Sequence, residues 1–124
     1  MRRIFAGALL AATTGIPALA ASSVPVTVRS QGDLDTCIVG QVAGLNPAGD
    51  NFLAVRAGPG SDYAMLDKLR GGQEVWIFEE RGGWYGVAYG AAQINCSPVA
   101  RDRAYDGPGR SGWVSKRYVR EVAG

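Results

Sequence analysis

The 124-residue sequence contains no histidine and only two lysines, Lys68 and Lys116. Histidine is the side chain that most often serves as a general base near neutral pH, so its absence removes the usual proton acceptor. Ser115 and Lys116 are neighbours along the chain, which is the wrong arrangement for a nucleophile and its base. No group of residues has the spacing of metal ligands. We therefore expect no enzyme activity, no catalytic residue, no metal site and no cofactor.

Beyond residue 20 the sequence also lacks any segment with the 3.6-residue apolar period of a helix, and it shows no repeat. Most of the 18 glycines instead fall between short runs of strand-forming residues, where they mark turns. This spacing predicts an all-β domain of the small barrel or sandwich type. Strands are expected at 37–42, 52–56, 74–80, 84–89, 112–114 and 119–122, with a short strand or irregular segment at 64–69 and a turn at 115–118.

The first twenty residues have the pattern of a secretory signal peptide. Arg2 and Arg3 precede the apolar run "IFAGALLAATTGIPALA", which ends in the small-x-small site Ala18-Leu19-Ala20. A membrane anchor is the alternative, but threonine, glycine and proline interrupt the run, and its unbroken part is too short to span a bilayer. We therefore expect cleavage before Ala21, export to the periplasm or the extracellular space, and no stable membrane insertion.

Removal of this segment changes the charge balance of the chain. Without Arg2 and Arg3, the 13 Lys and Arg residues become 11, which equals the 11 Asp and Glu residues. A neutral chain gives no electrostatic reason to bind nucleic acid or anionic membranes. Arg101 to Arg103 and Arg110 form a modest basic cluster that Asp102 and Asp106 dilute, so a solvated loop is favoured there and no nucleic-acid partner is expected.

The two cysteines, Cys37 and Cys96, have no third cysteine to compete with them. In an oxidising compartment a disulfide is the expected outcome. A loop of this length would stabilise the fold by roughly 4 kcal/mol in the chain-entropy model. The alternative is a free reactive thiol, but the chain has no histidine and no Cys-x-x-Cys pair to support it.

The two central strands predict apolar side chains on both faces of a hairpin, because residues alternate between faces along a strand. One face belongs to the predicted barrel core, which we assign to Leu53, Val55, Val75, Ile77, Tyr85, Val87 and Val114. The other face carries Trp76, Phe78, Trp84, Gly86 and Ala88. A soluble monomer seldom leaves so large an apolar surface bare. Either the irregular stretch 90–111, held by the Cys37–Cys96 link, or a partner protein must cover it, and we favour the first.

The stretch Gly58-Pro59-Gly60-Ser61 follows a predicted strand and raises the question of a phosphate-binding loop. Such a loop needs a helix behind it, whose N-terminal amides face the anion. No long helix follows here, and there is no Gly-Lys-Ser/Thr. A β-turn is therefore the better interpretation.

The order of these motifs, "LAVRAGPGSDYAMLDKLRGGQEVWIFEERGGWYGVAY" and then "SGWVSKRYV", resembles the bacterial SH3 (SH3b) domain family. The resemblance implies a small SH3-like barrel over 37–122, after the signal peptide at 1–20 and a lead-in at 21–36 that is either mobile or an added edge strand. The chain departs from the family pattern by a long inserted loop, about 90–111. The matching positions are Leu53, Val55, Arg56, Gly58, Pro59, Tyr63, Met65, Leu69, Gly72, Val75, Gly83, Trp84, Tyr85, Val87, Gly112, Trp113, Val114, Tyr118 and Val119.

The resemblance implies an exported, single-domain, non-catalytic binding module that recognises cell-wall peptidoglycan or a wall-associated peptide. Such a ligand needs an aromatic groove with a few polar anchors. The candidate ligand-binding residues are Tyr63, Tyr118, Trp84 and Trp113, although both tryptophans also pack the barrel rim in this family. Arg56 is a candidate anchor for a peptide carboxylate, against the favoured alternative of a salt bridge to Asp62 or Glu80.

Two other functions remain open at this point. The alternative binding function is that of a periplasmic protein-interaction or inhibitor module, which would dock on the Trp76/Phe78/Trp84 face. A small hydrolase would need a carboxylate pair such as Glu79 and Glu80. Adjacent strand residues point to opposite faces, so these two cannot straddle one bond, and a charge pair at the hairpin end is expected instead.

Overall fold

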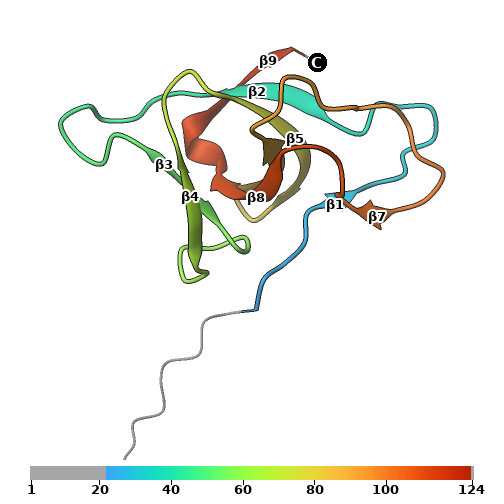
Figure 1. Ribbon diagram of the computed structural model, residues 1–124, viewed down its shortest axis with the longest axis horizontal. Helices are drawn as coiled ribbons and strands as arrows, with labels where there is room; N and C mark the ends of the chain where they lie inside the picture. Colours follow the sequence, from blue (N-terminus) through green and yellow to red (C-terminus); the bar gives the residue numbers. More distant parts are fainter. Residues whose placement is uncertain (1–21, 124) are drawn as a thin grey trace, which may run out of the picture.

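The computed structural model describes residues 22–123, which form an all-β fold (Figure 1). Seven strands make one antiparallel sheet in the order β4-β3-β8-β6-β5-β2-β9, and β1 pairs with β7 in a separate two-stranded sheet. Among the described residues no helix has the length and apolar character to cross a membrane. The elements are β1 Thr27–Val28, β2 Ile38–Val42, β3 Leu53–Arg56, β4 Met65–Leu69, β5 Glu74–Arg81, β6 Trp84–Tyr89, β7 Arg103–Ala104, β8 Arg110–Ser115, the 3-10 turn η1 Lys116–Tyr118 and β9 Val119–Ala123.

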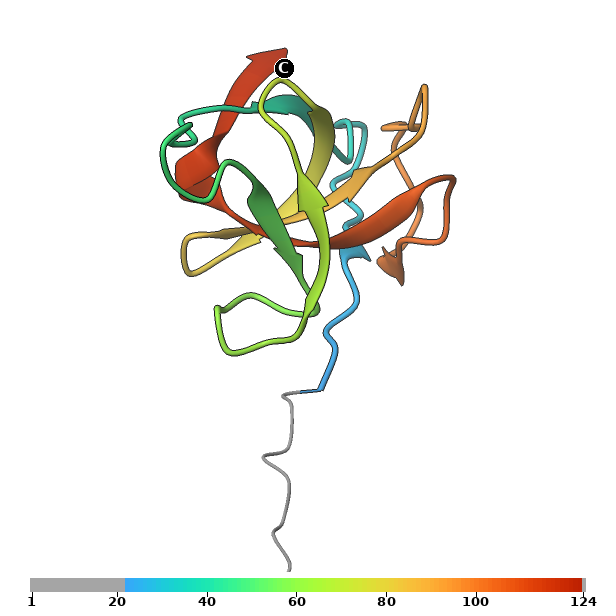
Figure 2. The same ribbon diagram turned by 60° about the vertical axis from the view of Figure 1, so that its left-hand side comes forward.

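The larger sheet curls on itself as an SH3-like barrel does, but it does not close (Figures 1 and 2). Its terminal strands, β4 and β9, have no hydrogen-bonded partner on their outer sides. The prediction of an all-β SH3-like fold is therefore confirmed, and the expectation of a closed sheet is corrected. The signal peptide predicted at 1–20 lies outside the described residues and stays a prediction.

The strand predictions are confirmed, with differences at their ends. β8 begins at Arg110 instead of Gly112, and η1 takes the place of the turn predicted at 115–118. The short strand β7 lies inside the stretch that the sequence marks as irregular. β5 and β6 are joined by Gly82 and Gly83, whose φ angles of +53° and +86° are the positive values that a tight two-residue hairpin turn requires.

The barrel core fills the concave side of the curled sheet. All seven predicted residues are buried and in mutual contact there, so that prediction is confirmed. Val42, Leu69 and Tyr89 join them. Because Leu53 and Val55 alternate with half-buried residues in β3, simple strand periodicity is enough to place this core.

Tyr89 closes the barrel core beside the edge strand β4. Its hydroxyl donates a hydrogen bond to the Asp67 carboxylate at 3.0 Å, and Arg110 pairs with the same carboxylate at 3.3 Å. Burial, together with the hydrogen bond to Asp67, raises the pKa of Tyr89 to about 12. The hydrogen bond from the neighbouring Lys68 amide, and then the one from Tyr89, lower the pKa of Asp67.

A second core lies on the opposite face of the β5–β6 hairpin. Trp76 and Phe78 are buried there by Val26 and Val28 of the lead-in and by Ile94 of the insertion. The cover is therefore internal, as favoured from the sequence, although the contribution of the lead-in was not foreseen. Trp76 and Phe78 are not free for a partner, so the predicted docking surface on the Trp76/Phe78/Trp84 face is wrong, although Trp84 itself stays half-buried.

The lead-in and the insertion are held together by covalent and hydrogen bonds. Cys37 and Cys96 form a disulfide with a Cα–Cα distance of 5.0 Å, which confirms the predicted pairing. The Thr36 amide donates to the Cys96 carbonyl at 2.7 Å, and the Tyr105 amide donates to the Val26 carbonyl at 2.8 Å. The described part of the lead-in, 22–36, thus contains a short strand at Thr27–Val28, which pairs with β7 of the insertion and not with an edge of the main sheet.

Glu79 is a buried carboxylate in the second core. A β-bulge between Ile77 and Glu79 places it opposite Gly86, and its side chain is 2% exposed. It accepts hydrogen bonds from the Thr27 amide at 2.6 Å, from Arg29 at 3.1 Å and from Arg81 at 3.1 Å. Glu79 therefore fixes the lead-in to the hairpin. It does form a charge pair near the hairpin end, with Arg81, but its burial and its bonds to the lead-in were not predicted.

Candidate binding groove

A groove of about 430 Å³ opens beside β3, on the surface that faces away from the barrel core. β3 pairs with β8 only through Arg56, opposite Trp113, so the start of β3 separates from β8 and leaves this hollow. We call it the β3 groove. It is lined by Leu45, Asn46, Gly49, Asp50, Phe52, Leu53, Ala54, Arg56, Met65, Trp84, Ser115 and Tyr118.

Three aromatic side chains, Phe52, Trp84 and Tyr118, line the β3 groove, and each is half-buried. Trp84 follows the positive-φ turn at Gly83, whose carbonyl accepts a hydrogen bond from the Lys116 amide at 2.9 Å. Tyr118 ends η1, and its carbonyl accepts from the Ala43 amide at 2.9 Å. Backbone bonds to neighbouring elements thus position two of the three rings. Flat rings held in this way offer contact area at a low entropic cost.

Arg56 supplies the positive charge of the β3 groove. Its Nη1 donates to the Tyr63 carbonyl at 3.2 Å, whereas its buried Nε has no hydrogen-bond partner. The salt bridge expected to Asp62 or Glu80 is not formed, because Glu80 pairs with Lys116 at 2.9 Å. An arginine carries five donors in a planar fork that matches a carboxylate. Arg56 therefore keeps donor capacity that no acidic side chain in residues 22–123 uses.

Tyr63 does not line the β3 groove. Its ring packs against Gly58 and Gly60. A Cβ added at Gly58 would collide with the ring, and one added at Gly60 would come within 2.8 Å of the Asp62 carboxylate. These glycines let the loop backbone lie flat on the tyrosine, which is the physical reason for the Gly-Pro-Gly turn. The turn interpretation of this loop agrees with the structure, and Tyr63 contributes to the groove only through its backbone carbonyl on Arg56.

Trp113 is fully buried, so its prediction as a ligand-contacting residue is corrected. Its indole Nε1 donates to the Val24 carbonyl at 2.7 Å, and the Arg81 guanidinium lies 5.3 Å from the ring centre. The glycine before it, Gly112, packs against Val55 and leaves no open side. Trp113 holds the lead-in in place and presents no surface to a ligand.

The structure thus brings Arg56, Trp84 and Tyr118 together and separates Tyr63 and Trp113 from them. Sequence reasoning missed Phe52 and Asp50 as groove residues. Strand alternation could have found Phe52, because it shares a face with Ala54 and Arg56 when Leu53 faces the core. In the described part of the chain, no three His, Cys, Asp or Glu side chains lie close enough to hold a metal ion.

Comparison with known proteins supports the same architecture. The family model described as "Bacterial SH3 domain" matches residues 51–120, which include β3 to β8, η1 and most of the β3 groove. Neither the curated proteins nor the solved structures contain a match. Strand β2 lies outside the matched residues but is hydrogen-bonded into the same sheet between β5 and β9. The family match covers more than half of the sequence, and the chain belongs to the bacterial SH3 domain family.

Proposed function

We propose that the protein is a non-catalytic binding module that recognises the peptide part of peptidoglycan, or a wall-associated peptide, in the β3 groove. Bacterial SH3 domains often bind the cell wall. The observation that carries the proposal is the meeting of Arg56, Trp84 and Tyr118 in one groove, where Arg56 has no acidic partner.

The chemistry of the groove fits a peptide ligand with a free carboxylate. Phe52, Trp84 and Tyr118 provide apolar contact for side chains and for the flat peptide units. Arg56 provides a charge-assisted hydrogen bond, which is roughly twice as strong as a neutral one. Peptidoglycan stem peptides carry such carboxylates, and Asn46 and Asp50 add polar groups at the rim for peptide N–H groups.

The proposal includes a location outside the cytoplasm and a domain organisation. A disulfide such as Cys37–Cys96 persists in oxidising compartments, which supports the periplasm or the cell exterior. In this proposal residues 1–20 are a cleaved signal peptide, 21–36 are the lead-in and 37–122 are the SH3b domain. N-terminal sequencing of the protein recovered from its host would test the cleavage site before Ala21.

Co-sedimentation with purified peptidoglycan tests the binding function. The wild-type protein should pellet with the polymer, and Tyr118→Ala should lower the bound fraction at least about fivefold. Circular dichroism should show that this variant keeps its fold, although the half-buried ring also packs against the barrel core and its loss should lower the thermal midpoint. Leu34→Ala is the matched control, because Leu34 is 66% exposed and lies outside the β3 groove. Equal binding by Tyr118→Ala and wild type would contradict a role for the groove.

A defined peptide tests the anchor. A wall peptide with a free carboxylate should bind more tightly than its amidated form, and Arg56→Lys should remove most of this preference, since a lysine cannot reproduce the bidentate contact. If muropeptides changed on incubation with the protein, the non-catalytic part of the proposal would be wrong. Recovery of one host protein instead of wall polymer would favour the alternative, a periplasmic protein-interaction or inhibitor module.

A further inference from the structure

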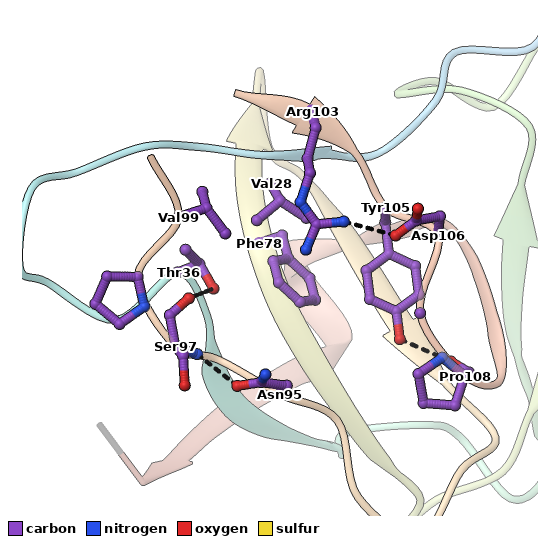
Figure 3. Close-up of a pocket in the computed structure, with 12 residues that line it drawn as sticks. Val28, Thr36, Phe78, Asn95, Ser97, Val99, Arg103, Tyr105, Asp106 and Pro108 are labelled. Atoms are coloured by element: carbon purple, nitrogen blue, oxygen red, sulfur yellow. Dashed lines mark hydrogen bonds and ion pairs between the residues drawn. The ribbon is translucent and has the colours of Figure 1, made fainter. Parts of the chain in front are cut away.

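A second cavity, of about 230 Å³, lies on the other side of the molecule, between the lead-in, β5 and the insertion (Figure 3). Its floor is made by Val28, Thr36 and Phe78, which are buried. Its rim is made by two parts of the insertion, with the lining residues Asn95, Ser97, Pro98, Val99, Arg103, Tyr105, Asp106, Gly107 and Pro108. It shares no residue with the β3 groove. The insertion that distinguishes this chain from the family pattern therefore builds a site of its own.

The apolar part of this cavity is an aromatic corner. The rings of Phe78 and Tyr105 have their centres 5.1 Å apart and are inclined at 47°. The Tyr105 hydroxyl donates to the Pro108 carbonyl at 2.7 Å, which holds the ring against the cavity (Figure 3). A ligand that enters would therefore meet two ring surfaces and the methyl groups of Val28 and Val99.

The polar part of the cavity is neutral. Among the described residues that line it, Arg103 and Asp106 are the charged ones, and they pair with each other at 2.6 Å. The side-chain oxygen of Asn95, Oδ1, accepts a hydrogen bond from the Ser97 backbone amide at 2.8 Å, which fixes the orientation of the Asn95 side-chain amide. The Asn95 amide nitrogen is then directed to the cavity in Figure 3. The site thus offers planar donors and acceptors without an excess charge, which disfavours an ionic ligand because its charge would have no counterpart.

The cavity is also pre-formed. The Cys37–Cys96 disulfide and the bond from Thr36 to the Cys96 carbonyl hold its lower wall. Ser30 donates from its hydroxyl to the Val99 carbonyl at 2.9 Å and from its amide to Asp102 at 2.7 Å, which holds the loop that follows. Small-molecule sites are usually formed in this way before the ligand arrives, so little ordering entropy is lost on binding.

We propose that this cavity binds one neutral saccharide unit. Its volume is below the range of about 300–1,000 Å³ that is usual for drug-sized ligands, so it fits a single ring. A sugar ring has an apolar face of C–H groups, which fits the Phe78–Tyr105 corner, and an edge of hydroxyl or acetamido groups. That edge requires the mixed donors and acceptors that Asn95, Arg103 and Asp106 provide. The saccharide site goes beyond the peptide groove and does not depend on it.

The test is a titration of the disulfide-bonded protein with triacetylchitotriose, a neutral N-acetylated saccharide, followed by calorimetry or by NMR. We expect saturable binding, and at least a tenfold weaker affinity for Tyr105→Ala. Asn95→Ala should weaken binding as well, and because Asn95 is exposed this variant keeps the fold. Tyr118→Ala, in the other groove, should bind the saccharide as the wild type does.

Each other result has a defined meaning. No binding of triacetylchitotriose or of maltotriose would overturn the proposal, as would binding that is insensitive to both Tyr105→Ala and Asn95→Ala. Tighter binding of the positively charged glucosamine trimer than of its acetylated form would overturn the inference of a neutral ligand. Loss of peptide binding in Tyr118→Ala with saccharide binding intact would support both sites independently, so a failure of one is distinguished from a failure of the other.

Discussion

The β5–β6 hairpin is buried on both faces, but the two faces are covered in different ways. The buried residues of the barrel core all come from strands of the main sheet, with Val55, Val75 and Val87 at 0% exposure. The second core is closed by two segments that come from outside the hairpin, the lead-in and the insertion. The burial of the first face follows from strand alternation within the sheet. The burial of the second face depends on contacts between distant segments, made by the Cys37–Cys96 disulfide, the Glu79 carboxylate and Trp113.

The largest effect is expected from Trp113→Ala. Trp113 is fully buried in the second core and also bonds the lead-in through Nε1. Loss of so large a buried side chain should lower the free energy of unfolding by about 3–5 kcal/mol, as measured by urea denaturation. Trp113→Phe, which keeps a ring, should lose clearly less. A loss below about 1 kcal/mol for the alanine variant would show that the second core is loosely packed.

Removal of the disulfide should have the next largest effect. Cys37→Ser combined with Cys96→Ser opens a link between residues 59 positions apart, and a loss of about 2–4 kcal/mol is expected. Amide hydrogen exchange should then become faster in the lead-in and in the insertion before it does in β5 and β6. A uniform increase in exchange over the whole chain would contradict the separation of the two cores.

Alkaline pH should weaken the barrel core through Tyr89. Its pKa is about 12 in the folded protein and near 10 when exposed. Between these values the unfolded chain releases a proton that the folded chain retains, so stability is complete below pH 10 and falls as the pH rises towards 12. The free energy of unfolding should drop by about 2 kcal/mol more in the wild type than in Tyr89→Phe. Equal pH profiles for the two proteins would show that Tyr89 is not shielded.

Two adjacent glutamates sharpen the comparison at the smallest scale. Glu79→Gln removes the charge that Arg29 and Arg81 meet in the second core, and a loss of about 1–2 kcal/mol is expected. Glu80→Gln is the matched control, because its pair with Lys116 is half exposed and surface pairs contribute little. Thermal unfolding should therefore separate Glu79→Gln from the wild type and leave Glu80→Gln unchanged. Equal shifts would mean that Glu79 is solvated in solution.

The sequence was sufficient for the strands and the barrel core because both follow a two-residue period that is read locally. The burial of Glu79 could not be predicted in this way. The bulge at Phe78 interrupts the alternation of faces along β5, and the partners of the carboxylate, Thr27 and Arg29, lie about 50 positions away. The prediction for Trp113 failed because its hydrogen-bond partner, Val24, is also remote in the chain. Long-range contacts leave no periodic signal in the sequence.

In the candidate groove, too, some residues could be predicted from the sequence and others could not. Arg56, Trp84 and Tyr118 were predicted as site residues and line one hollow. The loop that contributes Asn46 and Asp50 follows no pattern that would bring it to β3. The partner of Arg56 could not be predicted either. Glu80, one of its two expected partners, pairs with Lys116 instead, because the start of η1 lies beside the end of β5.

The bond between Trp113 and the Val24 carbonyl joins positions 89 residues apart. A ribosome that makes the chain in order would complete the β5–β6 hairpin before Ile94 and Trp113, the last buried residues of the second core, exist. Until then the hairpin would display Trp76 and Phe78 to its surroundings, and such exposed apolar surface makes partly folded chains prone to aggregate. This face of the hairpin would therefore stay incomplete until the last quarter of the chain is synthesised.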